Sequence, residues 1–269
     1  MSTKTLLITS VLFVFLLSVA AGVCFADASA QLEQADTYKD NKDYEQAEAI
    51  YRDIVTNYPG TDEAFQAQKN LALLYIITAR YSAGRQEVDT LITNFADHPE
   101  LPDEIYKFAG QYWNWGKRYE DARWLYEYIA ENHSDSDLAI KARTWAAGAD
   151  ILLGNDARAQ SGIDALIRDF AGHPELAGML WELGDGNWKF GKYDWSRQIY
   201  QHIFEIDPQD PLAMQAKARV AESDMRMGNY AAAQAGIDSL IVDFADHPEL
   251  PDEIYKFAGQ YWNWGKRYE

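Results

Sequence analysis

The stretch FADHPELPDEIYKFAGQYWNWGKRYE occupies residues 95–120 and occurs again, letter for letter, at residues 244–269. A diverged copy, FAGHPELAGMLWELGDGNWKFGKY, begins at Phe170 between them. The three copies therefore start at nearly even distances along the chain. Internal repetition of this kind is typical of solenoids, in which each unit packs against its neighbours and no single large core forms.

Each long copy divides into two shorter repeats with a spacing of about 37 residues, which lies in the range of helical repeats. A tyrosine, once replaced by aspartate, marks the same position in each short repeat. These anchor residues are Tyr44, Tyr81, Tyr119, Asp156, Tyr193, Tyr230 and Tyr268.

Small and large residues recur at fixed distances from the anchors. The ninth residue before each anchor is alanine or glycine, and the third residue after it is again small. The seventh and tenth residues after it are larger and apolar. This pattern predicts two packed helices per repeat, because small residues let two helix backbones approach closely.

Turn residues separate the predicted helices. Pairs such as Gly154-Asn155 and Gly191-Lys192 stand just before the anchors, where a tight helix–helix turn needs positive φ. Leu101-Pro102-Asp103-Glu104 is typical of a helix start, with an early proline and acids in the first turn.

Gly110, Ala122 and Tyr126, with Pro59 and Pro208 at repeat ends, carry a resemblance to tetratricopeptide-repeat (TPR) proteins. The resemblance covers residues 29–269 and implies an all-α fold, an α-solenoid of antiparallel helix pairs with about six and a half repeats. The period is longer than the usual 34 residues, so we expect longer turns between repeats. The chain stops after the first helix of the seventh repeat, and we expect the solenoid to be truncated there.

Residues 1–26 have the features of a signal peptide, with Lys4 followed by an uncharged apolar run. We expect cleavage near Ala26 or Ala28. An uncleaved membrane anchor is the alternative, because the run is just long enough to span a bilayer. Cys24 is the only cysteine, and Val23 before it disfavours lipid attachment. The mature chain is thus expected to be exported, periplasmic or extracellular, and without cysteine.

The chain carries 42 acidic and 24 basic residues, for a formal net charge of −18. Nucleic acids and anionic membrane surfaces are therefore excluded as expected partners, since both would be repelled. The phosphate-binding, dinucleotide-binding and metalloprotease motifs are absent. Three of the five histidines stand in HPE triplets, which we interpret as repeated turns. We expect no cofactor, no metal and no enzymatic activity.

The aromatic residues are the strongest indication of a binding surface, since all nine tryptophans lie in the repeat region. The TPR resemblance implies that the first helices line a concave surface, with exposed positions 12, 8, 5 and 4 residues before each anchor. Exposed tryptophans among amides and charges are typical of recognition surfaces. The alternative is that these tryptophans only pack between repeats and bind no partner. The predicted partner-binding residues are Lys107, Gln111, Asn114 and Trp115 in the third repeat, Trp181, Asp185, Trp188 and Lys189 in the fifth, and Lys256, Gln260, Asn263 and Trp264 in the seventh.

Even-numbered repeats place apolar residues in the corresponding stretch, which form either a groove floor or core. They are Leu73, Ile76, Ile77, Ile151 and Leu152.

Two functions of different classes follow. The first is a protein-interaction scaffold that holds a peptide or protein partner in the concave groove, since the opening repeat is similar to TPR segments of cell-envelope assembly proteins. The second is a glycan-binding module in which Trp115, Trp188 and Trp264 stack on sugars. A third class, an α-helical hydrolase, would require two convergent carboxyl groups in a cleft. The sequence leaves the oligomeric state open.

Overall fold

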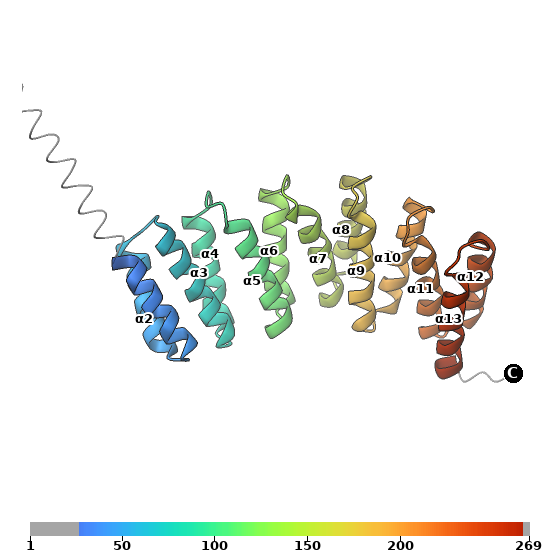
Figure 1. The fold of residues 1–269 in the computed structure, drawn as a ribbon, viewed down its shortest axis with the longest axis horizontal. Coiled ribbons are helices and arrows are strands. Elements are labelled where there is room, and N and C mark those ends of the chain that lie inside the picture. Colours follow the sequence, from blue (N-terminus) through green and yellow to red (C-terminus); the bar gives the residue numbers. More distant parts are fainter. Residues whose placement is uncertain (1–26, 266–269) are drawn as a thin grey trace, which may run out of the picture. The chain divides into compact units, whose positions relative to one another are not determined.

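The computed structural model describes residues 27–265, and their side chains as far as residue 260. A first helix covers residues 27–40. The helices that follow (Figure 1) are α2 (Tyr44–Asn57), α3 (Asp62–Ile77), α4 (Tyr81–Asn94), α5 (Leu101–Gly116), α6 (Tyr119–Asn132), α7 (Leu138–Leu153), α8 (Asp156–Asp169), α9 (Leu176–Lys189), α10 (Tyr193–Ile206), α11 (Ala213–Arg226), α12 (Tyr230–Asp243) and α13 (Leu250–Gly265). The predicted all-α solenoid of helix pairs is confirmed. The predicted signal peptide lies outside the described residues.

The anchor residues fix the start of the second helix in each repeat. All six second helices that can be followed here, α2, α4, α6, α8, α10 and α12, begin at their anchor and have 14 residues. Two residues before each anchor the backbone adopts positive φ, at Lys42, Ala79, Lys117, Gly154, Gly191 and Gly228. The turn geometry is thus the same in every repeat, although only three of these residues are glycine.

Small residues mark the point where the two helices of a repeat cross. In the fifth repeat the Ser196 hydroxyl of α10 donates a 3.0 Å hydrogen bond to the backbone carbonyl of Gly184 in α9. A Cβ atom on Gly184 would lie only 2.7 Å from the ring of Tyr200. The backbones therefore approach as closely as the predicted small–small contact requires.

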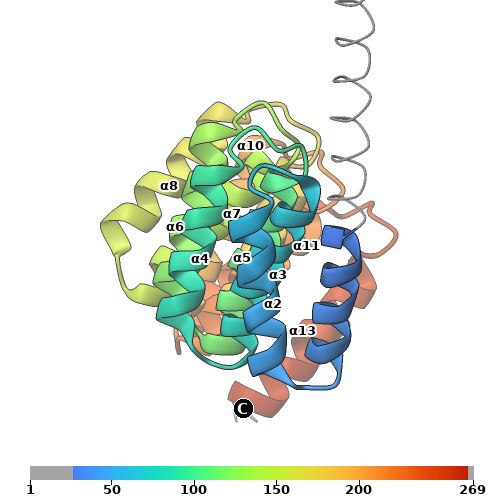
Figure 2. The ribbon, with the colours of Figure 1, turned by 90° about the vertical axis from the view of Figure 1, so that its left-hand side faces the viewer.

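The chain divides into two compact units, residues 1–117 and 118–269. In unit 1, α3 packs against α2, α4 and α5. In unit 2, α7 packs against α6, α8 and α9, and α11 packs against α10, α12 and α13. Figure 2 shows α6 and α8 to the left of α7. The first helix of each even-numbered repeat, which is α3, α7 or α11, therefore contacts three other helices. Whether residues 29–269 form one continuous solenoid stays a prediction.

The apolar stretches of the even-numbered repeats belong mainly to the core. Ile76 and Ile151 are buried, and Leu73 and Leu152 are half-buried. Ile77 alone among them is exposed. The sequence left two possibilities for these residues, the floor of a groove or the core. Ile76 and Ile151 belong to the core.

The three HPE triplets form turns before α5, α9 and α13. In each turn the histidine Nδ1 accepts a hydrogen bond from the backbone N–H two residues later, at 3.2, 3.2 and 3.3 Å. Each histidine ring also meets a phenylalanine three residues earlier edge-on. These histidines hold the lengthened turn between repeats. Among the described helices, none has the length and apolarity that crossing a membrane requires.

The close crossing in the fifth repeat predicts the effect of a single methyl group. Gly184→Ala should destabilise unit 2 by about 1–3 kcal/mol, because the added Cβ overlaps the buried Tyr200 ring. Gly178→Ala in the same helix is the matched control, since its Cβ would meet nothing within 4 Å. The control should be neutral or stabilising by up to about 1 kcal/mol. Urea unfolding followed by circular dichroism measures both, and equal midpoints for the two variants would contradict the account.

The turn geometry that recurs in every repeat predicts a stabilising substitution. Ala79 has a φ of 59°, where a Cβ is strained. Ala79→Gly should stabilise the chain by about 0.5–1 kcal/mol, because glycine adopts this conformation freely. Ala235→Gly, at an exposed position inside α12, should instead destabilise it by about 1 kcal/mol. In thermal melts, the midpoint should rise for Ala79→Gly and fall for Ala235→Gly.

Candidate functional site

Three first helices of unit 2 surround one open cavity of about 200 Å³. Helix α9 contributes Trp181, α11 contributes the middle of the lining, and α13 contributes the opposite wall. The lining residues are Trp181, Gln215, Arg219, Glu222, Glu253, Lys256 and Gln260. Aromatic, cationic, anionic and amide groups thus meet in a single place on the first-helix face.

Arg219 occupies the centre of this site. Its guanidinium lies 2.9 Å from a carboxylate oxygen of Glu222 on its own helix and 3.8 Å from Asp185 on α9. It also lies over the rings of Trp181 and Trp188, at 5.8 and 5.5 Å from their centroids. Charge pairing and cation–π attraction together hold the side chain between α9 and α11.

A second arginine continues the same ladder. The guanidinium of Arg226 lies 5.4 Å from the Trp188 ring centroid and 5.7 Å from that of Tyr193. Rings of α9 and α10 therefore alternate with guanidinium groups of α11. Two guanidinium groups of α11 thus lie over the Trp188 ring.

The orientation of Asp185 comes from the second helix of its own repeat. The Tyr200 hydroxyl donates a 2.5 Å hydrogen bond to Asp185 Oδ1. Burial, together with this bond to a carboxylate, raises the pKa of Tyr200, so its hydroxyl stays a donor. Tyr51 donates to Asp36 in the equivalent positions of the first repeat. The carboxylate at this position is thus fixed by the fold.

Glu222 is the most buried acid of the cavity. It accepts hydrogen bonds from Arg219 and, at 2.9 Å, from the amide nitrogen of Gln260 on α13. Burial raises the pKa of the Glu222 carboxyl, and the nearby Arg219 offsets this only in part. The amide oxygen of Gln260 is itself buried and has no hydrogen-bond partner among the described residues.

The structure brings together five of the predicted partner-binding residues. Trp181, Lys256 and Gln260 line the cavity, and Asp185 and Trp188 contact Arg219 beside it. The other predicted residues take no part in this cavity. Lys189 is exposed at the end of α9, whereas Lys107, Gln111, Asn114 and Trp115 belong to α5 in unit 1, and the side chains of Asn263 and Trp264 lie outside the described ones.

Helix α5 nevertheless shares features with α13, since the two have the same sequence. Lys107 pairs with Glu104 at 2.7 Å, as Lys256 pairs with Glu253. The Gln111 amide oxygen is buried without a hydrogen-bond partner among the described residues, and Trp115 is 56% exposed.

Sequence reasoning missed the contribution of α11. Gln215, Arg219 and Glu222 line the cavity, although the even-numbered repeats were expected to present apolar residues. A signal existed for Glu222. Glu222 stands eight residues before Tyr230, the same offset that selected Asp185 and Gln260, and it is polar where the second and fourth repeats are not.

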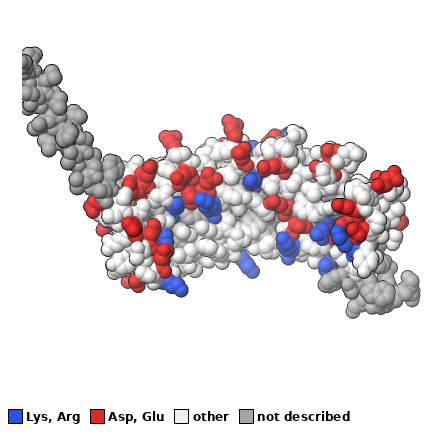
Figure 3. All heavy atoms as spheres, viewed as in Figure 1, with Lys and Arg blue, Asp and Glu red and all other residues white. Residues whose placement is uncertain are grey.

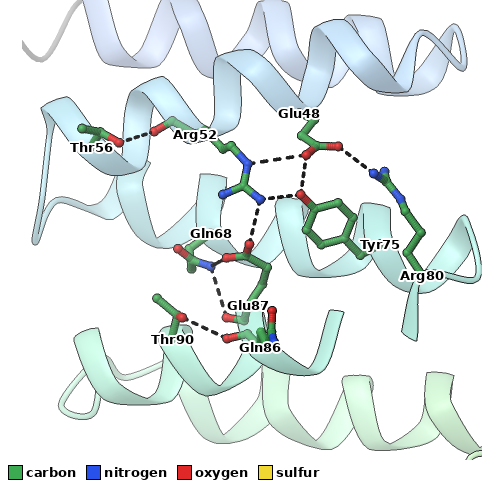
Figure 4. A network of polar contacts seen from close by, with 9 residues as sticks. All are labelled: Glu48, Arg52, Thr56, Gln68, Tyr75, Arg80, Gln86, Glu87 and Thr90. Carbon is green, nitrogen blue, oxygen red and sulfur yellow. Dashed lines mark hydrogen bonds and ion pairs between the residues drawn. The ribbon is translucent and has the colours of Figure 1, made fainter. Parts of the chain in front are cut away.

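A different polar network lies in unit 1, between the second helices α2 and α4 and over α3 (Figure 4). Arg52 reaches Glu87 at 3.0 Å and the Tyr75 hydroxyl at 2.5 Å, and Arg80 reaches Glu48 at 2.9 Å. The Tyr75 hydroxyl donates to Glu48. These hydrogen bonds and charges satisfy one another. We therefore assign this network to holding α2 and α4 on α3.

No group of three or more histidine, cysteine or acidic side chains in the described part of the chain is placed to hold a metal ion.

The buried carboxyl predicts a pH-dependent difference in stability. Because the folded-state pKa of Glu222 is raised, its contribution is present at acid pH and is lost as the pH rises through that pKa. Glutamine stays uncharged, so Glu222→Gln should gain stability relative to the wild type as the pH rises from about 4.5 to about 7. Glu182→Gln, at an exposed position of α9, should show no such gain. Urea midpoints at the two pH values provide the measurement, and a relative loss for Glu222→Gln would contradict it.

Comparison with known proteins finds a matching family model and several similar solved structures. Residues 29–61 match the model of the tetratricopeptide repeat family. A comparison with curated proteins finds no match. The solved structure of PilF from Pseudomonas aeruginosa is similar at 14% identity and a TM-score of 0.38, over 85% of this chain and 97% of that one. A TPR protein from Parabacteroides merdae is similar at 15% identity and a TM-score of 0.44, over 90% and 93%. The family match confirms a tetratricopeptide repeat at residues 29–61, and helix pairs like the predicted ones continue beyond it.

Proposed function

We propose that the chain is an exported, non-enzymatic scaffold that binds a peptide or protein partner on the first-helix face of unit 2. One observation carries this proposal. Trp181, Lys256 and Gln260 come from repeats that are distant in sequence, were selected by one positional rule, and line the same cavity.

The chemistry of the cavity suits a polypeptide. Lys256 and Gln215 present donors to carbonyl and carboxylate oxygens, while Glu253 presents acceptors to N–H groups. A polypeptide offers both kinds of group along its length. The cavity of about 200 Å³ is smaller than the several hundred Å³ that usually enclose a small ligand. It fits one or two side chains of a longer partner.

Glycan binding is the second candidate, and the site supports it less. Sugars stack on open aromatic faces, but Arg219 and Arg226 already lie over Trp188, and Arg219 lies over Trp181. Trp115 on α5, which is 56% exposed, is the described tryptophan best placed for stacking. Glycan binding would therefore centre on unit 1.

Export rests on the leader of residues 1–26, and a role in the cell envelope rests on the resemblance of the first repeat to TPR segments of envelope-assembly proteins. PilW, whose structure is described as that of a type IV pilus biogenesis factor, is similar at 13% identity and a TM-score of 0.41, over 84% of this chain and 98% of that one. That description applies to PilW, and we infer no pilus function from it.

A panel of random dodecapeptides, displayed on phage and panned against the purified chain, tests the proposal. We expect selected peptides to bind the wild type and to bind Lys256→Ala and Trp181→Ala about tenfold more weakly, as for loss of a central contact. Isothermal titration calorimetry with the synthetic peptides gives the dissociation constants.

Two control variants locate the binding. Arg168→Ala removes an exposed cation of α8, on a second helix, and should leave the affinity unchanged. Lys107→Ala removes the lysine of α5 that corresponds to Lys256, and it reports whether unit 1 takes part. Peptide dissociation constants that are unchanged in both Lys256→Ala and Trp181→Ala would refute the proposed site. Binding of cell-wall oligosaccharides, lost in Trp115→Ala, with no peptide selected would favour the glycan function instead.

A further inference from the structure

A second hollowed surface of unit 2 lies where the turns between repeats meet. A cavity of about 650 Å³ opens between the α10–α11 turn and the α12–α13 turn. A smaller one, of about 210 Å³, lies between the α8–α9 turn and the same α10–α11 turn. These three turns follow the upper edge of unit 2 in Figure 1. We call this surface, with its two cavities, the turn edge. It shares no lining residue with the cavity between α9, α11 and α13.

The larger cavity is open because of a residue that differs from unit 1. There the His98 ring stacks on Phe65, with 3.6 Å between centroids and 12° between planes. Met214 takes the place of Phe65 in the sixth repeat, and His247 only meets Phe244 edge-on at 6.3 Å. The ring that fills this space in unit 1 is missing, so a hollow remains.

The turn edge includes apolar side chains that are partly exposed. Val242 and Ile206 are 74% and 43% exposed, although a large apolar side chain gains free energy when it is covered. Phe204 and Phe244 are half-buried beside them. Exposed apolar side chains gathered around a cavity of this size indicate a surface that another molecule covers.

Acidic residues border these apolar side chains. Asp207 and Asp210 use one carboxylate oxygen each to accept local backbone N–H bonds, at 2.9 and 2.7 Å. Asp243 pairs with Lys217, and Asp246 is exposed. Figure 3 shows acidic side chains where the α12–α13 turn lies.

Unit 1 lacks most of this acidic border. Its residues at the positions of Asp207, Asp210, Asp243 and Asp246 are Tyr58, Thr61, Asn94 and Asp97. Three of the four acids are thus particular to the turn edge of unit 2. A hollow with exposed apolar side chains and added negative charge thus occur together on this surface.

We propose that the turn edge of unit 2 binds a peptide segment in which apolar side chains stand between lysines or arginines. The apolar side chains enter the cavity between Phe204, Met214 and Val242. The basic side chains pair with Asp207, Asp210 and Asp246 on the border. This surface is separate from the groove on α9, α11 and α13, and it gives the scaffold a second partner site.

Fluorescence anisotropy of a labelled peptide of alternating lysine and leucine, titrated with the full chain, tests the proposal. Met214→Phe should raise the dissociation constant about tenfold, a change of about 1.4 kcal/mol, because phenylalanine fills the hollow as Phe65 does in unit 1. Asp246→Asn should weaken binding about threefold, as expected for an exposed charge. Peptides with glutamate for lysine or serine for leucine should bind far more weakly.

Asp97→Asn is the matched control, because it removes the same acid from the equivalent turn of unit 1. It should leave binding unchanged, and so should Lys256→Ala in the groove. Equal weakening by Asp97→Asn and Asp246→Asn would show attraction to the overall negative charge and would overturn the proposal. Wild-type affinity in Met214→Phe would overturn it too. If that variant does not fold, Val242→Ser makes the same test at an exposed position.

Discussion

The close crossing of two helices at small residues is the contact on which the rest of the structure depends. In the fifth repeat it joins Gly184 to Ser196 and Tyr200. In the fourth, a Cβ on Gly162 would lie 3.3 Å from that of Ala147, and in the sixth the corresponding distance is 3.1 Å. No larger residue fits at these points without moving a helix. The repeat can therefore vary widely elsewhere while its helix pairs keep one geometry.

Odd and even repeats differ in the residues of their helices, and this difference determines which first helices carry polar side chains. In the first and fifth repeats a tyrosine of the second helix bonds an aspartate of the first, as in Tyr51–Asp36 and Tyr200–Asp185. The even repeats have smaller apolar residues at the tyrosine position, and their first helices are buried by three neighbours. The groove of unit 2 arises because α11 departs from this rule and carries Arg219 and Glu222 between two odd repeats.

The helices could be predicted from sequence almost to the residue, because the small-residue contacts and the helical period are local and recur at every anchor. The turn at Ala79 could not, since its positive φ is imposed by the crossing and not by the residue. Glu222 was missed because the second and fourth repeats suggested apolar even repeats, and Arg219 was missed because it stands 11 residues before Tyr230, outside the selected positions. Lys107 and Lys256 have the same local sequence, so only the packing shows that Lys256 lines the cavity of unit 2.

Because α3, α7 and α11 are each packed against three other helices, they should be the most stable parts of the fold. Native-state hydrogen exchange measures this directly, because the slowest amides report the last segments to open. The account predicts the slowest exchange in α3, α7 and α11, with faster exchange in the second helices α4, α8 and α12. Equal protection in all helices, or slowest exchange in the second helices, would contradict it.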